Sequence, residues 1–203
     1  MLTRRHIRVK VMQSLYAFNQ SQNDNLATEE KFLIKSMEEM YDLFLLQLSL
    51  ITEIRQNAET FLEKSQKKHL ATTEDKDPNR KFLDNRVFTL LNDHEGLQKA
   101  LEDRKINHWK MDDEYAAIIW SELRQSDMYE TYMETRESSF KEDKDFIIRI
   151  FKDIIAPNEK LYEYLEDKKL TWLDDLPLVN TAILKILQTL KDQPGHSVNL
   201  PKL

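Results

Sequence analysis

Apolar side chains recur at the three- and four-residue spacing of a helix along most of this chain. A broad apolar stripe over residues 28–68 predicts one long helix, with its longest apolar-rich run at residues 43–51. A shorter helix is expected before it, capped at Thr3 and running to about Asn19. We expect this first helix to pack through one face, which carries Ile7, Val11, Leu15 and Phe18.

Beyond residue 81 the predicted helices become shorter and the surface becomes more polar. Apolar positions predict helices around residues 82–91, 97–101, 115–123, 146–155, 158–165 and 176–190. Pro157 should end one of them, because proline disfavours helical geometry in the residue before it. The chain has only 2 glycines and 5 prolines and lacks the alternation typical of strands. We therefore predict an all-α protein without a β-sheet.

Positive charge is concentrated at the beginning of an otherwise acidic chain. The net charge is -6, yet Arg4, Arg5, Arg8 and Lys10 all precede the first acid, Asp24. Cations in the first turn of a helix oppose its dipole at roughly 0.3–1 kcal/mol each, so a functional reason for them is worth seeking. A solvated chain end is the alternative interpretation. A basic end on an acidic protein favours a polyanionic partner such as nucleic acid.

Two further side chains of this segment suit RNA. The amide of Gln13 can hydrogen-bond a base edge, and an exposed Tyr16 ring can stack on a base for about 1–3 kcal/mol. Core packing is the alternative for Tyr16. The cations surround the helix start and share no single face, which suits single-stranded RNA better than a duplex groove. The predicted RNA-binding residues are Arg4, Arg5, Arg8, Lys10, Gln13 and Tyr16.

No pattern of catalytic or metal-binding residues emerges. The 5 histidines are scattered, and cysteine is absent. The acidic clusters at 112–114 and 174–175 precede apolar helical patterns, where acids favour the positive end of the helix dipole. Trp109, Trp120 and Trp172 are expected in the core or at hinges, and not as platforms for base stacking. We expect no catalytic site, metal or cofactor, no secretory signal or membrane span, and a cytoplasmic protein.

The first helix resembles that of the NusB family of bacterial transcription antitermination factors. The resemblance is carried by Arg4-Arg5-His6-Ile7-Arg8 and by Val11-Met12-Gln13-Ser14-Leu15-Tyr16-Ala17. Ile7 and Val11 stand where small residues are typical of the family. Residues 145–158 and 176–185 are similar to two later helices of that family, with Asn180 in place of an acid and Lys185 in place of an arginine. The similar segments, 3–23 and about 144–191, cover roughly a third of the chain.

The resemblance implies two helical bundles joined by an enlarged helical middle. On this view residues 1–71 form an N-terminal helical segment with the basic RNA-binding helix. Residues 72–80 form a linker, residues 81–140 an inserted helical region, and residues 141–203 the start of a second bundle. We expect that bundle to be incomplete and the native gene to continue past Leu203. Its stripe of Val179, Ile183, Ile186 and Leu190 could then dock on the enlarged middle or on a second copy of the chain, and we expect a self-association contact there, a possible homodimer.

The function implied by the resemblance is RNA-binding transcription antitermination. Such proteins bind boxA-type single-stranded RNA together with NusE, a small-subunit ribosomal protein, and help RNA polymerase read through terminators. Two alternatives remain open. One is a NusB-like accessory domain of an RNA cytosine methyltransferase, which a nucleotide-binding segment after Leu203 would favour. The other is a helical protein-interaction module, which a lack of affinity for single-stranded RNA at low salt would favour.

Overall fold

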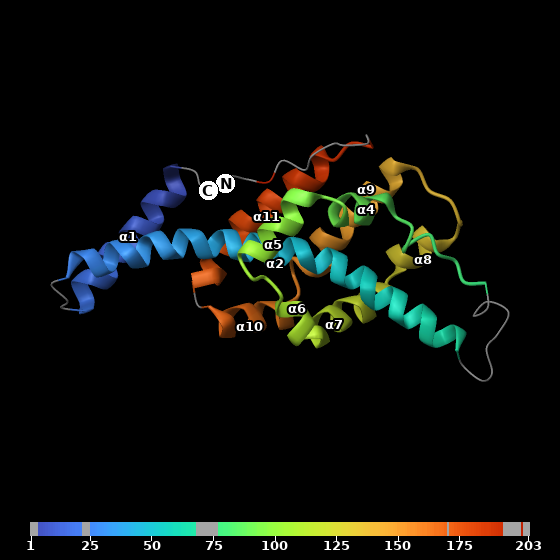
Figure 1. Cartoon of the computed structure of the whole chain (residues 1–203), viewed down its shortest axis with the longest axis horizontal. Coiled ribbons are helices and arrows are strands. Elements are labelled where there is room, and N and C mark those ends of the chain that lie inside the picture. Colours follow the sequence, from blue (N-terminus) through green and yellow to red (C-terminus); the bar gives the residue numbers. More distant parts are fainter. Residues whose placement is uncertain (1–3, 22–24, 68–76, 170, 193–199, 201–203) are drawn as a thin grey trace.

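The computed structural model describes residues 4–21, 25–67, 77–169, 171–192 and 200, and it contains no strand within them. The prediction of an all-α protein is therefore confirmed. The helices, shown in Figure 1, are α1 (Arg4–Ser21), α2 (Leu26–Gln66), α4 (Arg86–Asn92), α5 (Glu95–Asp103), α6 (His108–Met111), α7 (Asp113–Arg124), α8 (Asp127–Met133), α9 (Phe140–Ile150), the π-helical segment η1 (Phe151–Ile155), α10 (Glu159–Lys168) and α11 (Thr171–Thr189).

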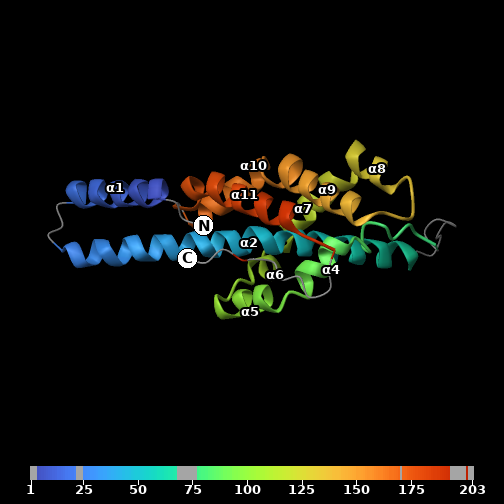
Figure 2. The same cartoon turned by 90° about the horizontal axis from the view of Figure 1, so that it is seen from above.

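The long helix α2 is the spine of the molecule. Every side chain from Leu43 to Ile51 is buried, on all sides of the helix. A helix segment that is buried around its whole circumference must be covered by other elements on every side. Helices α7 and α11 and the short helices α4–α6 provide this cover, and Figure 2 shows them along both flanks of α2.

One continuous apolar core joins the segments that the sequence analysis separated. It includes Phe44 from α2, Phe88 from α4 and Phe151 from η1. Two tryptophans attach other helices to the α2 backbone: the indole N–H of Trp109 donates to the Leu46 carbonyl and that of Trp172 to the Glu39 carbonyl, both at 2.9 Å. The expected core position of the tryptophans is confirmed, while the division into three segments stays a prediction.

The C-terminal helix α11 corrects one expectation. Its stripe of Val179, Ile183, Ile186 and Leu190 is buried within the chain, with exposures of 0, 0, 8 and 3%. Helix α11 packs on α2 and α9, which cover the stripe without a second copy. The stripe is therefore covered by the chain itself, and these residues are not exposed for the expected self-association contact. The helix also begins at Thr171, before the expected start at Leu176, and it includes Pro177.

Helix α1 packs less closely than its apolar spacing predicted. It lies antiparallel to the first part of α2, and the two form a hairpin at one end of the molecule (Figure 2). Its buried side chains are the polar Lys10 and Ser14, whereas Ile7 is 39% and Leu15 52% exposed. Among the described helices, α2 packs along α1 and the start of α11 contacts it through Lys10, and one face of apolar residues on α1 is left half-covered.

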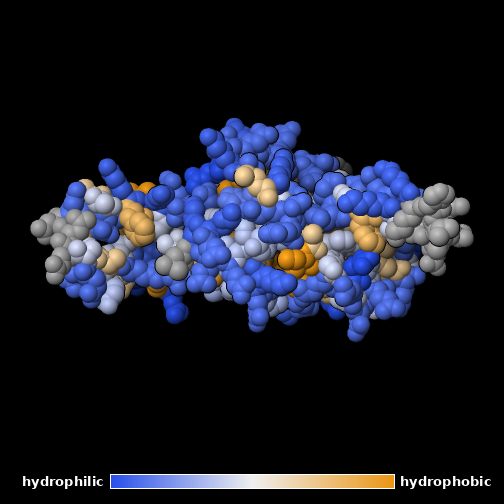
Figure 3. All heavy atoms as spheres, turned by 90° about the horizontal axis from the view of Figure 1, so that it is seen from below, coloured by the Kyte–Doolittle hydropathy of each residue, from blue (hydrophilic) through white to orange (hydrophobic). Residues whose placement is uncertain are grey.

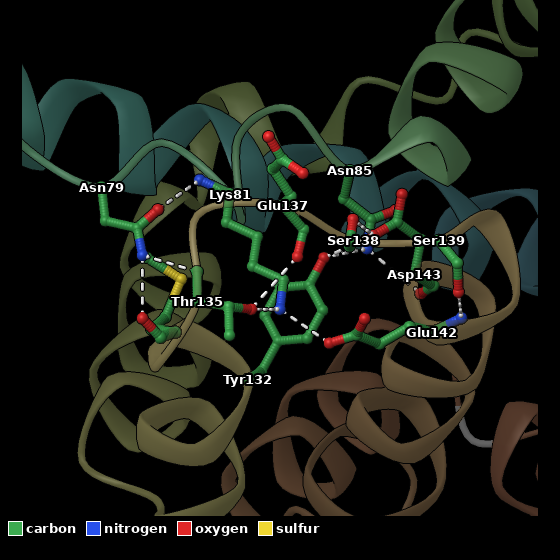
Figure 4. A network of polar contacts seen from close by, with 11 residues as sticks. Asn79, Lys81, Asn85, Tyr132, Thr135, Glu137, Ser138, Ser139, Glu142 and Asp143 are labelled. Atoms are coloured by element: carbon green, nitrogen blue, oxygen red, sulfur yellow. Dashed lines mark hydrogen bonds and ion pairs between the residues drawn. The ribbon is translucent and has the colours of Figure 1, made fainter.

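A buried polar network connects the segment before α4 with α8 and α9 (Figure 4). The hydroxyl of Tyr132 donates to Asp143 Oδ1 at 2.6 Å, and the Arg86 backbone N–H donates to Asp143 Oδ2 at 3.0 Å. Burial, together with the bond to Asp143, raises the pKa of Tyr132, so the phenol remains a donor. Lys81 donates to Glu142 at 2.6 Å and lies 4.3 Å from the centre of the Tyr132 ring.

Asn85 occupies the centre of this network and is fully buried. Its Oδ1 accepts from the Val87 backbone N–H at 2.9 Å, which caps α4. Its Nδ2 donates to the Asp143 carbonyl at 3.1 Å and to the Tyr132 hydroxyl at 3.2 Å. The side chain thereby holds three separate parts of the fold together.

Replacing Asn85 by Ala should lower the free energy of unfolding by about 2–4 kcal/mol, because a cap is lost and buried partners are left unpaired. Urea denaturation monitored by circular dichroism measures the effect. The matched control is Ser126→Ala, which removes the cap of α8 but no buried network. That change should reduce stability by only about 1 kcal/mol. Equal effects of the two substitutions would contradict a central role for Asn85.

Candidate nucleic-acid interface

The start of α1 presents three arginines to solvent. Arg4, Arg5 and Arg8 are exposed, and none forms an ion pair with another residue in the described part of the chain. The first turn of α1 contains no acid. Three exposed guanidinium groups therefore surround the positive end of the helix dipole, an arrangement that favours anions.

Lys10 does not belong to this exposed set, contrary to the sequence-based prediction. Its side chain is buried, and Nζ lies 2.9 Å from Asp175 Oδ2 in α11. Burial raises the pKa of the Asp175 carboxyl, and the Lys10 ammonium opposes that rise. A lysine enclosed in such a pair cannot reach a phosphate, so we assign Lys10 to the attachment of α1.

Gln13 strengthens the same attachment. Its Nε2 donates to Asp174 Oδ2 at 3.1 Å, at an exposed position beside the buried pair. The side-chain amide already has a protein partner, which limits its part in base recognition. Lys10 and Gln13 together fix the register of α1 against the beginning of α11.

Tyr16 is 66% exposed, so the alternative of core packing is wrong for this residue. Arg5, Val9, Met12 and Tyr16 follow one another at intervals of four, three and four residues and thus share one face of α1. Arg5 and Tyr16 are separated by about 16 Å along the helix axis, at 1.5 Å per residue. The exposed face of α1 therefore carries a cation at its start and an aromatic ring three turns later.

The acidic clusters serve the structure in more ways than helix capping. Asp174 lies in the first turn of α11, as expected, and Asp113 in the first turn of α7. Asp175 and Asp112 instead bind side chains distant in sequence: Asp175 pairs with Lys10, and Asp112 with Lys168 at 2.9 Å. No local signal could identify these pairs, because the two partners are brought together only by helix packing.

The described residues were also compared with the requirements of a metal site and of a membrane-spanning helix. Within the described residues, no cluster of three or more His, Asp or Glu side chains is arranged to hold a metal ion. None of the described helices combines the length and apolar character needed to cross a bilayer. Comparison of the chain with family models, curated proteins and solved structures finds no match.

Replacing Lys10 by Met should lower the free energy of unfolding by about 3–5 kcal/mol at neutral pH, because Asp175 stays buried without its partner. This loss of stability should be smaller at acidic pH. Without the lysine, the pKa of Asp175 rises further above its ordinary value of 3.8. Just above pH 3.8 the folded state therefore holds a proton that the unfolded chain has released, and stability falls as pH increases through the raised pKa.

Urea denaturation between pH 4 and 7 measures this dependence. The matched control is the double variant Lys10→Met/Asp175→Leu, which removes both charges. Its stability should return close to that of the unmodified chain, since replacing a whole buried pair by apolar side chains is often neutral or stabilising. A single variant as stable as the unmodified chain at pH 7 would show that the pair does not hold α1.

Proposed function

We propose that this chain is a cytoplasmic, bacterial RNA-binding antitermination factor of the NusB type. It binds boxA-type single-stranded RNA together with NusE and promotes read-through by RNA polymerase. The observation that carries the proposal is the exposure of Arg4, Arg5 and Arg8 at an acid-free helix start, within the segment that resembles the NusB family.

Electrostatics support RNA as the ligand. Each guanidinium can neutralise a phosphate and release bound counterions, which supplies most of the sequence-independent affinity for nucleic acid. The net charge of -6 would repel a polyanion from the rest of the surface, so binding should be confined to the basic end. The arginines have no competing ion pair within the described chain and are free to bind an anion.

The arrangement along α1 also suits a single strand. A strand that runs along the exposed face would meet the guanidinium of Arg5 first and the ring of Tyr16 three turns later. Splayed bases stack on such rings, whereas bases inside a duplex are already stacked on each other. This order of cation and ring is the reason for proposing single-stranded RNA and not a duplex.

A helical protein-interaction module is the second candidate function. Apolar side chains on the hairpin of α1 and the first part of α2 are unusually exposed: Met12 is 70% and Leu26 62% exposed. Surfaces of this kind commonly mark contacts between proteins. The two functions are compatible, because the proposed factor itself acts with a protein partner.

Replacing Arg4, Arg5 and Arg8 together by Ala should flatten the log–log salt dependence of RNA binding by about 2 units, at about 0.7 per phosphate contact on a single strand. The melting temperature should stay unchanged or rise slightly, because the cations oppose the helix dipole. Fluorescence anisotropy with a labelled boxA-type RNA at several salt concentrations measures the slope. The matched control replaces the exposed Lys141, Lys152 and Lys160 by Ala. If the arginine and lysine triple variants change the salt dependence of RNA binding equally, the proposed RNA site at the start of α1 is wrong.

Replacing Tyr16 by Ala should weaken binding of the same RNA by about 1–3 kcal/mol, the usual worth of one base–aromatic stack. The salt slope should not change, because no cation is removed. Val9→Ala on the same face serves as the control and should leave RNA affinity unaltered. If the Tyr16→Ala variant binds the RNA with unchanged affinity, the Tyr16 ring is not part of the RNA interface.

A further inference from the structure

A small pocket lies between the C-terminal part of α2, the segment of residues 77–85, α7 and α8, and it has a volume of about 180 Å³. On one side it is lined by the buried Ala58, Phe82 and Leu83, and on another by Arg124, which is exposed. The pocket therefore extends from the core to the surface beside Arg124. Figure 3 shows a largely hydrophilic face of the molecule, with hydrophobic residues in a few separate places, one of them toward the end where α2 ends.

Four aromatic side chains line this pocket. The rings of Phe82, Trp120 and Tyr129 contact one another, with centres 5.4–5.6 Å apart, and the ring of Phe61 lies 6.2 Å from that of Trp120. Protein cores contain few voids larger than a water molecule. An apolar cavity of about 150 Å³ can hold one benzene ring. The volume and the lining of this pocket therefore fit a single aromatic ring.

Three of the lining residues carry hydrogen-bond donors that have no partner in the described part of the chain. The indole N–H of Trp120 makes no hydrogen bond there, whereas those of Trp109 and Trp172 donate to backbone carbonyls. The hydroxyl of Tyr129 and the guanidinium of Arg124 donate to no other described residue either. Buried tryptophan and tyrosine side chains usually find a partner for these groups. The three donors are therefore available to a ligand.

Arg124 makes the opening of the pocket positive. Its guanidinium lies 4.3 Å from the centre of the Phe61 ring and pairs with no carboxylate among the described residues. Burial raises the pKa of Tyr129 to about 12, and the charge of Arg124 opposes that rise. The phenol consequently keeps its proton at neutral pH and remains a donor close to the guanidinium.

The lining offers few acceptors in return. It includes no Asp or Glu, and its remaining polar side chain is Asn79. The amide nitrogen of Asn79 donates to two backbone carbonyls, and its oxygen accepts from the Lys81 backbone N–H at 3.0 Å. A ligand that suits this pocket must therefore bring the acceptors itself.

We infer that this pocket binds a small aromatic carboxylate, with the ring among the four aromatic side chains and the carboxylate beside Arg124. Charge-assisted hydrogen bonds between guanidinium and carboxylate are among the strongest in proteins. Aromatic rings also attract cations, but here Arg124 would repel one. A neutral ring would leave the donors without acceptors. The pocket shares no residue with the proposed RNA site on α1, and its test uses no RNA.

Fluorine NMR of para-fluorobenzoate with the full chain should show saturable binding, with a Kd at or below roughly 1 mM, a modest affinity for so small a ligand. Unlabelled benzoate should displace the probe. Benzyl alcohol should compete at least roughly tenfold less well, and benzylammonium less well still, because neither supplies a carboxylate. An absence of saturable binding up to roughly 10 mM overturns the proposal. Competition by benzyl alcohol or benzylammonium as effective as that by benzoate does the same.

Substitutions at the opening of the pocket test its donors. Arg124→Met should raise the Kd for the probe roughly tenfold or more, because the charge-assisted bond is lost. Arg149→Met is the matched control, since Arg149 is exposed on α9 and does not line the pocket. Tyr129→Phe should raise the Kd severalfold yet leave the melting temperature unchanged, because this hydroxyl has no partner within the described chain. Equal Kd values for the two arginine variants overturn the proposal.

Two further variants test where the probe binds. Ala58→Leu should abolish binding, because the larger side chain fills the pocket at its buried side. Circular dichroism checks that this variant remains folded, and a folded variant that binds the probe with unchanged affinity overturns the proposal. Replacing Arg4, Arg5 and Arg8 together by Ala should leave the Kd for the probe unchanged. A loss of probe binding in that triple variant would place the anion at the start of α1 and likewise overturn the proposal.

Discussion

Burial of the middle of α2 is the constraint on which this structure depends. Nine consecutive side chains from Leu43 to Ile51 are removed from solvent, so other helices must cover every side of that segment. Hydrophobic burial has no preferred direction, but the hydrogen bonds from the indole N–H groups of Trp109 and Trp172 to α2 carbonyls are directional. These bonds therefore help to orient the covering helices on α2. The short helices after residue 81 are thereby assembled around one continuous core.

Helix α1 is attached by a different kind of interaction. It lies outside the main core, and its closest contact with α11 is the buried pair of Lys10 and Asp175. Burying both charges is expensive, and their attraction must offset the lost hydration. The pair fixes how α1 is rotated, and this rotation decides which side chains face solvent.

That rotation separates three surfaces on one short helix. Polar residues face α11, the line from Arg5 to Tyr16 faces solvent, and Val11, Leu15 and Phe18 line an apolar groove against the first part of α2. RNA binding is proposed for the second surface. Arg4 and Arg8 lie on the same side of α1 as the groove residues, at the beginning of the helix.

The sequence by itself determined the helical class, because glycine and proline are scarce and apolar residues recur at helical spacing. It also indicated the long second helix, the buried tryptophans and the charged end, all of which are local properties. It could not reveal that Lys10 would be buried or that the stripe from Val179 to Leu190 would be covered. Those outcomes depend on contacts between residues far apart in the chain, such as Lys10 and Asp175, which only the tertiary packing of the helices brings together.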